Sequence, residues 1–169
     1  TLDWESQFTG PSWNFAWVRK ACVMKDRIQQ LMGDKLTGEQ FRHWLGIARF
    51  FHALEYARLV NVFGDVPYYS HEVHRDQLSE IYKERNPRNE VMDSVFSDFR
   101  YALQNVKQDD GAQYVNRYVV AAFVSRWALF EGSWQKYHYQ NNERAKLCFN
   151  LAVEAAQVVI NSDRNAIAT

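Results

Sequence analysis

The sequence predicts an all-α fold of about five main helices, paired as antiparallel hairpins and interrupted by one long extended loop. Only 7 Gly and 3 Pro occur in 169 residues. Each proline falls at a boundary between periodic segments, as is typical of an all-helical chain. Within those segments, apolar residues recur every three or four positions. The length is that of one domain with a real core. We therefore expect residues 1–169 to form a single helical domain.

The first helix is expected over residues 12–32. Ser12 follows a proline and is the candidate N-cap of this helix. Gly33 lies just past the expected end, where a residue in the left-handed conformation commonly closes a helix. Both ends of the helix are thus predicted from local signals.

The second helix is expected over residues 38–63, because Thr37 and Gln40 form the capping box that begins a helix. Apolar residues nearly encircle this helix, which is typical of a central helix with neighbours on several sides. A charge held among packed helices must be paired to avoid a large desolvation cost. We therefore expect Glu55 to pair with an arginine, either Arg58 or one from another helix.

Three further helices follow after a loop. The third begins at Asn86, the expected N-cap, with Pro87 at the first helical position, and ends in a polar link over residues 107–112. The fourth is expected over residues 116–137, and the fifth ends near Asn161. Short loops join these helices into antiparallel hairpins. Small residues of the fourth helix mark where another helix can approach: Ala121, Ala122, Ala128 and Gly132.

The long loop covers residues 64–85. Gly64 breaks the preceding helix, and Pro67 forces the residue before it into an extended conformation. Tyr68 and Tyr69 follow directly. This loop is where helical structure gives way to a candidate functional surface.

The charge and hydropathy of the chain exclude several function classes. Twenty Lys and Arg balance 20 Asp and Glu, so the chain lacks the basic surface that a phosphate backbone or an anionic membrane demands. No window reaches the roughly 18 apolar residues of a membrane span. The first residues resemble no signal peptide, so if the natural protein is exported, we expect its targeting segment to have been removed. We expect no nucleic-acid partner.

No sequence motif indicates catalysis, a cofactor or a metal. A glycine-rich phosphate loop, a serine elbow and a paired Cys-x-x-Cys are all absent from the sequence. His71 and His74 lack a metal-binding spacing and are predicted to be solvated loop residues. His52 and Glu55 could form half of a carboxylate-bridged two-metal site, but no second motif completes it, so a buried hydrogen-bonded pair is favoured. We expect a protein that is not an enzyme.

The two cysteines are predicted to be buried thiols. Cys22 and Cys148 both lie inside helical patterns. Two cysteines far apart in the sequence do not make a disulfide framework, and free cysteine is among the most frequently buried residues.

Aromatic residues are numerous, with 6 Trp, 9 Tyr and 11 Phe. Those on helical stripes are predicted to lie in the core: Trp44, Phe99, Phe123, Trp127 and Phe130. Others lie outside helices or at their ends, and their flat apolar faces suit stacking on sugar rings. For Trp4, Trp13, Tyr68 and Tyr69, the alternative role is packing that holds a loop in place. The candidate ligand-binding residues are Trp4, Trp13, Trp17, Tyr68 and Tyr69.

Three ordered blocks of the sequence resemble the SusD/RagB family. The first block covers residues 48–67, which read ARFFHALEYARLVNVFGDVP and are similar to the family signature that ends a long helix. The second covers residues 85–103, and the third covers residues 121–160. Together the blocks span nearly the whole chain from about Trp13 onward.

The resemblance implies a function and a place in the cell. Family members are exported lipoproteins on the outer face of the bacterial outer membrane, built on tetratricopeptide-like helix pairs. They bind a nutrient, usually an oligosaccharide or polysaccharide, and form a lid over a SusC-like TonB-dependent transporter barrel. They are not catalysts, in agreement with the motif search. The helical hairpins would be the tetratricopeptide-like scaffold that packs against the transporter.

Two departures from the family shape this expectation. Family members are considerably longer, so the chain is expected to be a fragment that lacks the lipid-bearing cysteine and a large carboxy-terminal part. Ligand contacts in the family vary with the substrate, so the five aromatic residues are nominated from ring chemistry alone. A tetratricopeptide-like adaptor that binds a protein or peptide in a helical groove is the competing hypothesis. A helical enzyme is the third.

Overall fold

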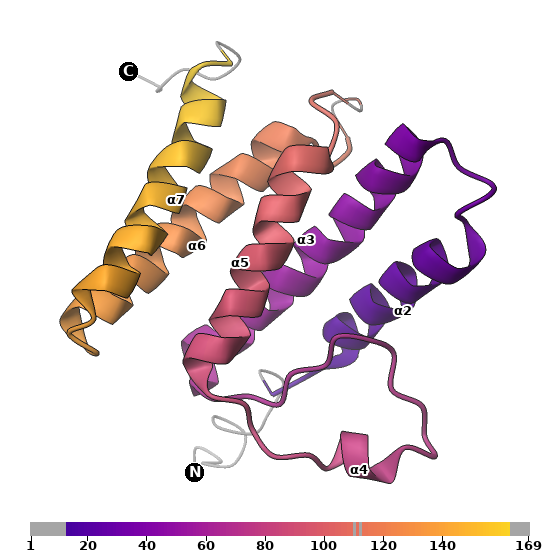
Figure 1. The fold of residues 1–169 in the computed structure, drawn as a ribbon, viewed down its shortest axis with the longest axis horizontal. Coiled ribbons are helices and arrows are strands. Elements are labelled where there is room, and N and C mark those ends of the chain that lie inside the picture. Colours follow the sequence, from indigo (N-terminus) through magenta and orange to yellow (C-terminus); the bar gives the residue numbers. More distant parts are fainter. Residues whose placement is uncertain (1–12, 110, 112, 163–169) are drawn as a thin grey trace, which may run out of the picture. The chain divides into compact units, whose positions relative to one another are not determined.

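The structure is a computed structural model that describes residues 13–109, 111 and 113–162. Within these residues every regular element is a helix, apart from one isolated bridge between Val66 and Asn86 (Figure 1). The all-α, tetratricopeptide-like fold is confirmed, with five long helices and one short helix. They are α2 (Ala16–Leu31), α3 (Gly38–Phe63), α4 (Leu78–Ile81), α5 (Arg88–Asn105), α6 (Arg117–Tyr137) and α7 (Asn142–Ile160).

The chain divides into two compact units, Thr1–Ala102 and Leu103–Thr169, with the boundary inside α5. Each unit is described by itself below. The first unit contains α2, α3, the long loop with α4, and most of α5. The second contains the α6–α7 hairpin. That the whole chain is one domain stays a prediction.

The helix α2 begins later than the sequence pattern predicts. Its first residue is Ala16, whose backbone N–H donates to Asn14 Oδ1 at 2.7 Å. An asparagine side chain two residues before the helix therefore satisfies one of the free donors of its first turn. The predicted cap, Ser12, lies outside the described residues.

The prediction that Gly33 closes α2 in the left-handed conformation is wrong. Met32 is the C-cap, with φ −116°, and Gly33 has no positive φ. The backbone N–H groups of Lys35 and Leu36 donate to the Met32 carbonyl at 3.2 and 3.1 Å. A run of turns thus reverses the chain, and no left-handed residue is needed.

The helix α3 agrees with its predicted bounds. Thr37 Oγ1 accepts from the Gln40 backbone N–H at 3.3 Å, and Gln40 Oε1 accepts from the Thr37 N–H at 3.0 Å, which is the predicted capping box. Arg58 Nε lies 3.0 Å from Glu55 Oε2, so the predicted ion pair is confirmed. Twelve residues of the helix are buried, in keeping with a central position in the first unit.

The start of α5 is capped from elsewhere in the chain. The helix begins at Arg88, one residue after Pro87. The Arg88 backbone N–H donates to Asp65 Oδ1 at 2.8 Å, whereas Asn86 Oδ1 accepts from the Tyr68 N–H at 2.9 Å. The prediction that Asn86 is the N-cap is therefore wrong, because its side chain is committed to the loop and a carboxylate favoured by the helix dipole takes its place.

The second unit is an antiparallel hairpin of α6 and α7 (Figure 1). The two helices approach closely at Gly132, where an added Cβ would lie 2.6 Å from the Phe149 ring. This confirms Gly132 as a point of close helix approach. Asn116 and Asn141 cap the two helices: the side chain of Asn116 accepts from two backbone N–H groups of the first turn, and that of Asn141 accepts from one.

The predicted aromatic core is only partly confirmed. Phe99 is fully buried, but Trp44 is 39% exposed, and Phe123 and Phe130 are each 37% exposed. Trp127 is half-buried. Apolar residues occur on several faces of α3 and α6, and the helices packed against each of them cover only some of those faces.

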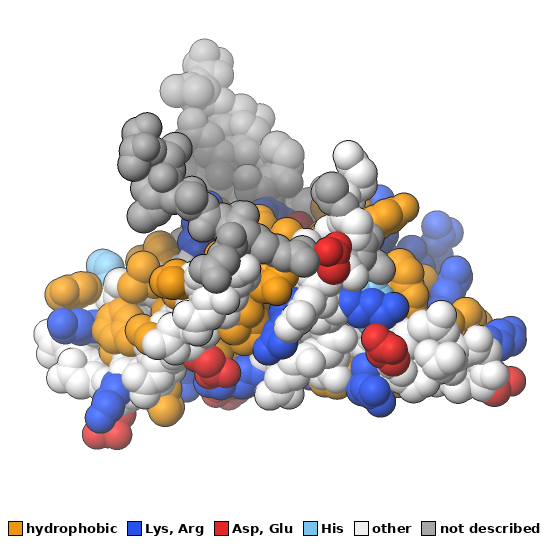
Figure 2. Space-filling model, turned by 90° about the horizontal axis from the view of Figure 1, so that it is seen from above, with side chains coloured by type: hydrophobic (Ala, Val, Ile, Leu, Met, Phe, Trp, Pro, Cys, Tyr) orange, Lys and Arg blue, Asp and Glu red, His pale blue; other side chains and the backbone are white. Residues whose placement is uncertain are grey.

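Both cysteines are buried free thiols, as predicted. None of the described helices is both long and apolar enough to cross a membrane. Figure 2 shows Lys and Arg side chains interspersed with Asp and Glu over the face in view, in keeping with the equal numbers of both charges.

Candidate functional site

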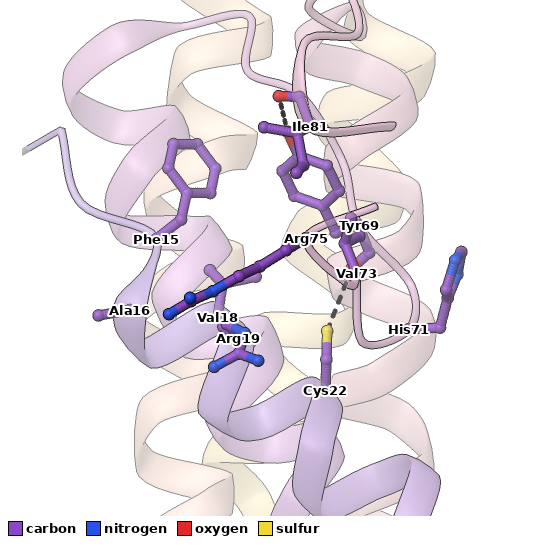
Figure 3. A pocket seen from close by; sticks show the side chains of 10 residues that line it. All are labelled: Phe15, Ala16, Val18, Arg19, Cys22, Tyr69, His71, Val73, Arg75 and Ile81. Carbon is purple, nitrogen blue, oxygen red and sulfur yellow. Dashed lines mark hydrogen bonds between the residues drawn. The ribbon is translucent and has the colours of Figure 1, made fainter. Parts of the chain in front are cut away.

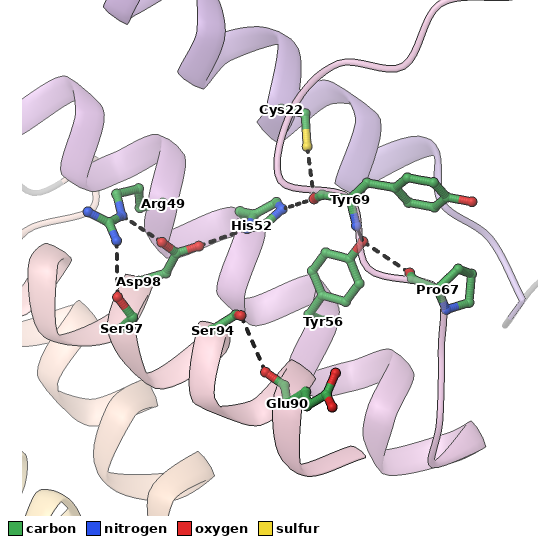
Figure 4. Close-up of polar contacts among 10 residues, drawn as sticks. All are labelled: Cys22, Arg49, His52, Tyr56, Pro67, Tyr69, Glu90, Ser94, Ser97 and Asp98. Atoms are coloured by element: carbon green, nitrogen blue, oxygen red, sulfur yellow. Dashed lines mark hydrogen bonds and ion pairs between the residues drawn. The ribbon is translucent and has the colours of Figure 1, made fainter. Parts of the chain in front are cut away.

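A buried polar network fastens the long loop to α3 and α5 (Figure 4). His52 Nδ1 lies 2.8 Å from Asp98 Oδ2, and His52 Nε2 lies 2.8 Å from the carbonyl oxygen of Tyr69. Arg49 Nε donates to the other oxygen of Asp98 at 2.6 Å. The side chains of His52 and Asp98 are 1% and 7% exposed. The predicted pairing of His52 with Glu55 is therefore wrong.

The Asp98 carboxyl is held in its charged form. Burial alone would raise its pKa, but the hydrogen bonds and positive charges of His52 and Arg49 outweigh burial and lower the pKa below its usual value. A buried charge is tolerated only when it is paired in this way. The network is thus an ion pair that joins α3 to α5 and extends to the loop.

Tyr56 makes the second attachment of the loop. Its hydroxyl donates to the Pro67 carbonyl at 3.3 Å and accepts from the Tyr69 backbone N–H at 2.6 Å. Burial raises the pKa of the phenol far above its usual value, so the hydroxyl keeps its proton and can donate. Cys22 Sγ adds a weak bond to the Tyr69 carbonyl at 3.5 Å.

These attachments come from the block that resembles the family signature. Arg49, His52 and Tyr56 lie on one helix, and Asp65 and Pro67 lie in the turn that follows it. His52 and Tyr56 bond to the loop, and Asp65 accepts from the first backbone N–H of α5. Arg49 instead bonds to Asp98, in the middle of α5. The signature residues therefore have a structural role: they fix the loop and join α3 to α5.

The two loop tyrosines face different cavities. Side chains of neighbouring residues in an extended segment point to opposite sides. Tyr69 lines a cavity of about 500 Å³, whereas Tyr68 lines one of about 580 Å³. We call the first the loop cavity and the second the polar cavity.

The loop cavity lies between the start of α2 and the long loop (Figure 3). The rings of Phe15 and Tyr69 meet edge to face with their centroids 5.8 Å apart. Tyr69 is held by a hydrogen bond from its hydroxyl to the Ile81 carbonyl at 3.2 Å, and the Lys83 ammonium lies 4.5 Å from its ring centroid. The other lining residues are Ala16, Val18, Arg19, Cys22, His71, Val73, Arg75 and Ile81.

The loop cavity combines apolar faces with a few cationic donors. Its apolar side chains and rings can contact a ring of a ligand, while guanidinium groups of Arg19 and Arg75 can donate hydrogen bonds. Arg19 also pairs with Glu72 at 2.9 Å. Such a mixture suits a polyhydroxylated ring compound.

The polar cavity has a different lining. All of its residues except Leu45 carry a polar group, and they come from α2, α3, α5 and the loop. Tyr68 supplies the aromatic ring, and burial raises the pKa of its phenol to about 12. The other lining residues are Lys25, Gln29, Arg49, Ser70, Asp93, Ser94, Ser97 and Asp98.

No family model matches the chain. A curated relative, SusD-like protein P2 of Formosa agariphila, is 30% identical over 118 residues, which are 69% of this chain and 20% of the relative. The chain belongs to the SusD-like family. It spans only a fifth of the length of that relative. Members of this family are binding proteins rather than catalysts.

Solved structures have the same fold. A SusD superfamily protein of Parabacteroides distasonis matches with a TM-score of 0.74 and 20% identity, over 98% of this chain and 32% of that chain. A SusD-like carbohydrate binding protein of Bacteroides vulgatus matches with 0.67 and 16%, over 93% and 32%. A laminarin binding SusD-like protein matches with 0.62 and 18%, over 92% and 29%. At these identities the likeness concerns the fold alone.

The structure does not bring the nominated aromatic residues of the SusD-like chain into one site. Trp13 is half-buried, its ring 4.8 Å from that of Phe63 and 5.2 Å from that of Phe15, so it packs at the end of α3. Trp17 is 60% exposed and lines neither cavity defined above. Trp4 lies outside the described residues.

Sequence reasoning missed one residue that had a readable signal. The buried positions of α2 are Val18, Ala21, Cys22, Lys25 and Ile28, which form one helical stripe. A lysine in the middle of an apolar stripe is unusual, because lysine is seldom buried without a partner. That position could have been selected from the spacing alone.

Two further sequence predictions concern metal ions. His71 and His74 are loop residues, as predicted, and His71 is exposed to solvent. Among the residues that the structure describes, no group of three or more His, Cys, Asp or Glu side chains could hold a metal ion.

Proposed function

We propose that this chain is part of a cell-surface protein that binds an oligosaccharide or polysaccharide and delivers it to a SusC-like TonB-dependent transporter. The observation that carries the proposal is the tyrosine pair of the long loop, held by signature residues of a SusD-like chain and facing two cavities. A solved relative described as laminarin binding supports a saccharide as the ligand class.

The loop cavity would make the main contact with the saccharide. Tyr69 and Phe15 offer apolar surface to a sugar ring, and the cationic side chains of Arg19 and Arg75 donate to its hydroxyls. Trp17, with its exposed ring, would extend this surface along α2. Trp13 would act by holding Phe15 in place. Trp4 and Tyr68 complete the proposed set of ligand-binding residues.

The proposed location is the outer face of the bacterial outer membrane. There the protein would be held by a lipid on a preceding segment, and its helical hairpins would pack against the transporter barrel. Binding without chemical change of the saccharide is the proposed activity. The family membership of the chain supports this location and partner.

Native gel electrophoresis in the presence of polysaccharides tests the proposal. The purified protein is run through gels that contain one neutral or acidic polysaccharide each, beside a non-binding protein of similar size. We expect at least one polysaccharide to slow this protein and not its neighbour. Equal migration in every gel of a broad panel would contradict saccharide binding, and chemical breakdown of a retained polysaccharide would contradict a purely binding role.

A tetratricopeptide-like adaptor is the second candidate function. It is favoured by a groove of about 810 Å³ along α2 and the start of α3, lined by apolar side chains that include Met24, Ile28 and Trp44. A helical groove of this kind can take an amphipathic helix or peptide. The location of the gene separates the two candidates: a transporter-barrel gene beside it favours saccharide import, and its absence favours the adaptor.

A further inference from the structure

Lys25 places a positive charge in the polar cavity. The residue is only 9% exposed and lines this cavity from α2. Among the described residues, none accepts a hydrogen bond from its ammonium group or forms an ion pair with it. Its ammonium is not among the described buried polar atoms that lack a partner, so it reaches the open side of the cavity. A ligand in the cavity can therefore meet an ammonium that no described side chain occupies.

The carboxylates near Lys25 are engaged or exposed. Both oxygens of Asp98 are taken, one by Arg49 and the other by His52. Asp26, the next residue on α2, accepts from the backbone N–H of Glu72 through Oδ2 at 2.7 Å. Asp93 lines the cavity but is exposed to solvent, where water screens its charge. Within the described residues, no carboxylate therefore forms an ion pair with Lys25.

Neutral hydrogen-bonding groups line the same cavity as Lys25. Ser97 Oγ accepts from Arg49 Nη2 at 3.3 Å, which leaves its own proton free to donate. The Gln29 amide and the Ser70 hydroxyl line the same cavity and can both donate and accept. The ring of Tyr68 forms part of the wall. A volume of about 580 Å³ is within the range of small-molecule sites.

We propose that the polar cavity is a subsite for an acidic saccharide, whose carboxylate or sulfate ester accepts from the Lys25 ammonium. The sugar hydroxyls bind to Gln29, Ser70 and Ser97 beside the Tyr68 ring. This inference rests on the proposed function and narrows it to saccharides that carry a negative charge. Neutral saccharides bind the loop cavity but gain nothing from the polar cavity.

Titration with small probes tests this subsite in the purified protein. The probes are D-glucuronate, D-glucose 6-sulfate, D-glucose and sodium sulfate, each followed by amide chemical shifts. We expect both acidic sugars to bind at least tenfold more tightly than glucose, with shifts at residues that line the polar cavity. Equal binding of glucose and the acidic sugars would overturn the proposal. So would sulfate binding more tightly than glucose 6-sulfate, because the cavity would then exclude the sugar ring.

The variant Lys25→Met removes the charge and keeps the length of the side chain. We expect it to abolish the preference for acidic sugars and to melt at about the temperature of the parent, because no ion pair among the described residues is lost. The matched control is Lys35→Met, at an exposed lysine of the α2–α3 connection, which should bind like the parent. A Lys25→Met protein that keeps the preference, or that melts well below the parent, would overturn the proposal.

Failure of this subsite and failure of the proposed function give different results. If a neutral polysaccharide slows the parent and Lys25→Met proteins equally while acidic sugars do not bind, the proposed function stands and the acidic subsite is wrong. If no saccharide of either kind binds, both are wrong.

Discussion

His52 and Asp98 meet at 2.8 Å inside the first unit, and the same imidazole lies 2.8 Å from the Tyr69 carbonyl. A carboxylate and a carbonyl both accept hydrogen bonds, so the imidazole satisfies both partners only when each of its nitrogens carries a proton. The His52 side chain thereby joins α3 to α5 and to the long loop. The position of the tyrosine pair depends on a charge pair 46 residues apart in the sequence.

Replacement of Asp98 by asparagine should strongly destabilise the protein. A neutral amide cannot balance the charges of Arg49 and His52, and the loss of one member of a buried ion pair costs about 3 to 5 kcal/mol. Urea unfolding followed by circular dichroism measures the free energy of unfolding. The matched control is Asp34→Asn, at an exposed aspartate, which should change it by less than about 0.5 kcal/mol. Equal effects of the two changes would contradict the structural role of Asp98.

Acid should weaken the same network. The pKa of Asp98 in the folded protein lies below the ordinary value of 3.8 that it takes in the unfolded chain. A lowered folded-state pKa contributes stability that is fully present above the unfolded pKa and is lost as the pH falls through the folded one. We expect the parent to lose stability on acidification below about pH 4, and Asp98→Asn to lack this component. Parallel pH profiles of the two proteins would be evidence against the lowered pKa.

An alanine at Gly132 should separate α6 from α7. The new Cβ would lie 2.6 Å from the Phe149 ring and 3.2 Å from Cys148 Cβ, and overpacking of this kind costs about 1 to 3 kcal/mol. The control is Gly33→Ala, where nothing lies within 4 Å of the new atom and φ is not positive. We expect it to be neutral or slightly stabilising. Melting temperatures compare the two, and an unchanged value for Gly132→Ala would be inconsistent with the close helix approach.

The Cys22 thiol should react slowly in the folded protein. Burial, the largest effect, raises its pKa to about 11, although the positive charge of Lys25 opposes the change. The thiolate is the reactive form, so little of it is present near neutral pH. Absorbance after addition of a disulfide reagent at about pH 8, just below the ordinary thiol pKa, should show slow modification without denaturant and fast modification in it. A fast reaction of Cys22 in the native protein, identified by mass spectrometry, would contradict its burial.

Helix bounds are predicted best where the signals lie within one turn. The capping box of Thr37 and Gln40 needs only residues three apart, and it locates the start of α3 correctly. The Glu55–Arg58 pair is equally local. These features depend on neighbours along the chain, so a single sequence contains all that is needed to predict them.

Contacts between distant segments account for the errors. Asn86 has the chemistry of an N-cap, but the loop uses its side chain and Asp65 takes the position. The true partner of His52 is Asp98, on another helix. Spacing along α3 does not reveal that partner, and it led to the incorrect pairing with Glu55.

The candidate site is predicted less completely than the fold. Tyr68 and Tyr69 stand out in the sequence because they follow a helix break, and both line cavities. That they face different cavities follows from the extended backbone and from the anchoring of Tyr69, which the residue types alone do not specify. Lys25 was missed, although its place on an apolar stripe is visible in the sequence.

The central claim is that the loop anchored by His52 and Asp98 presents Tyr69 to a saccharide. It is tested most directly by calorimetric titration of an oligosaccharide, cut from a retained polysaccharide, into the parent, Tyr69→Ala and Tyr82→Ala proteins. Tyr82 is 81% exposed and lines neither cavity. The account predicts at least tenfold weaker binding, about 1.4 kcal/mol, for Tyr69→Ala and unchanged binding for Tyr82→Ala. Parent-like affinity of a folded Tyr69→Ala protein would contradict it.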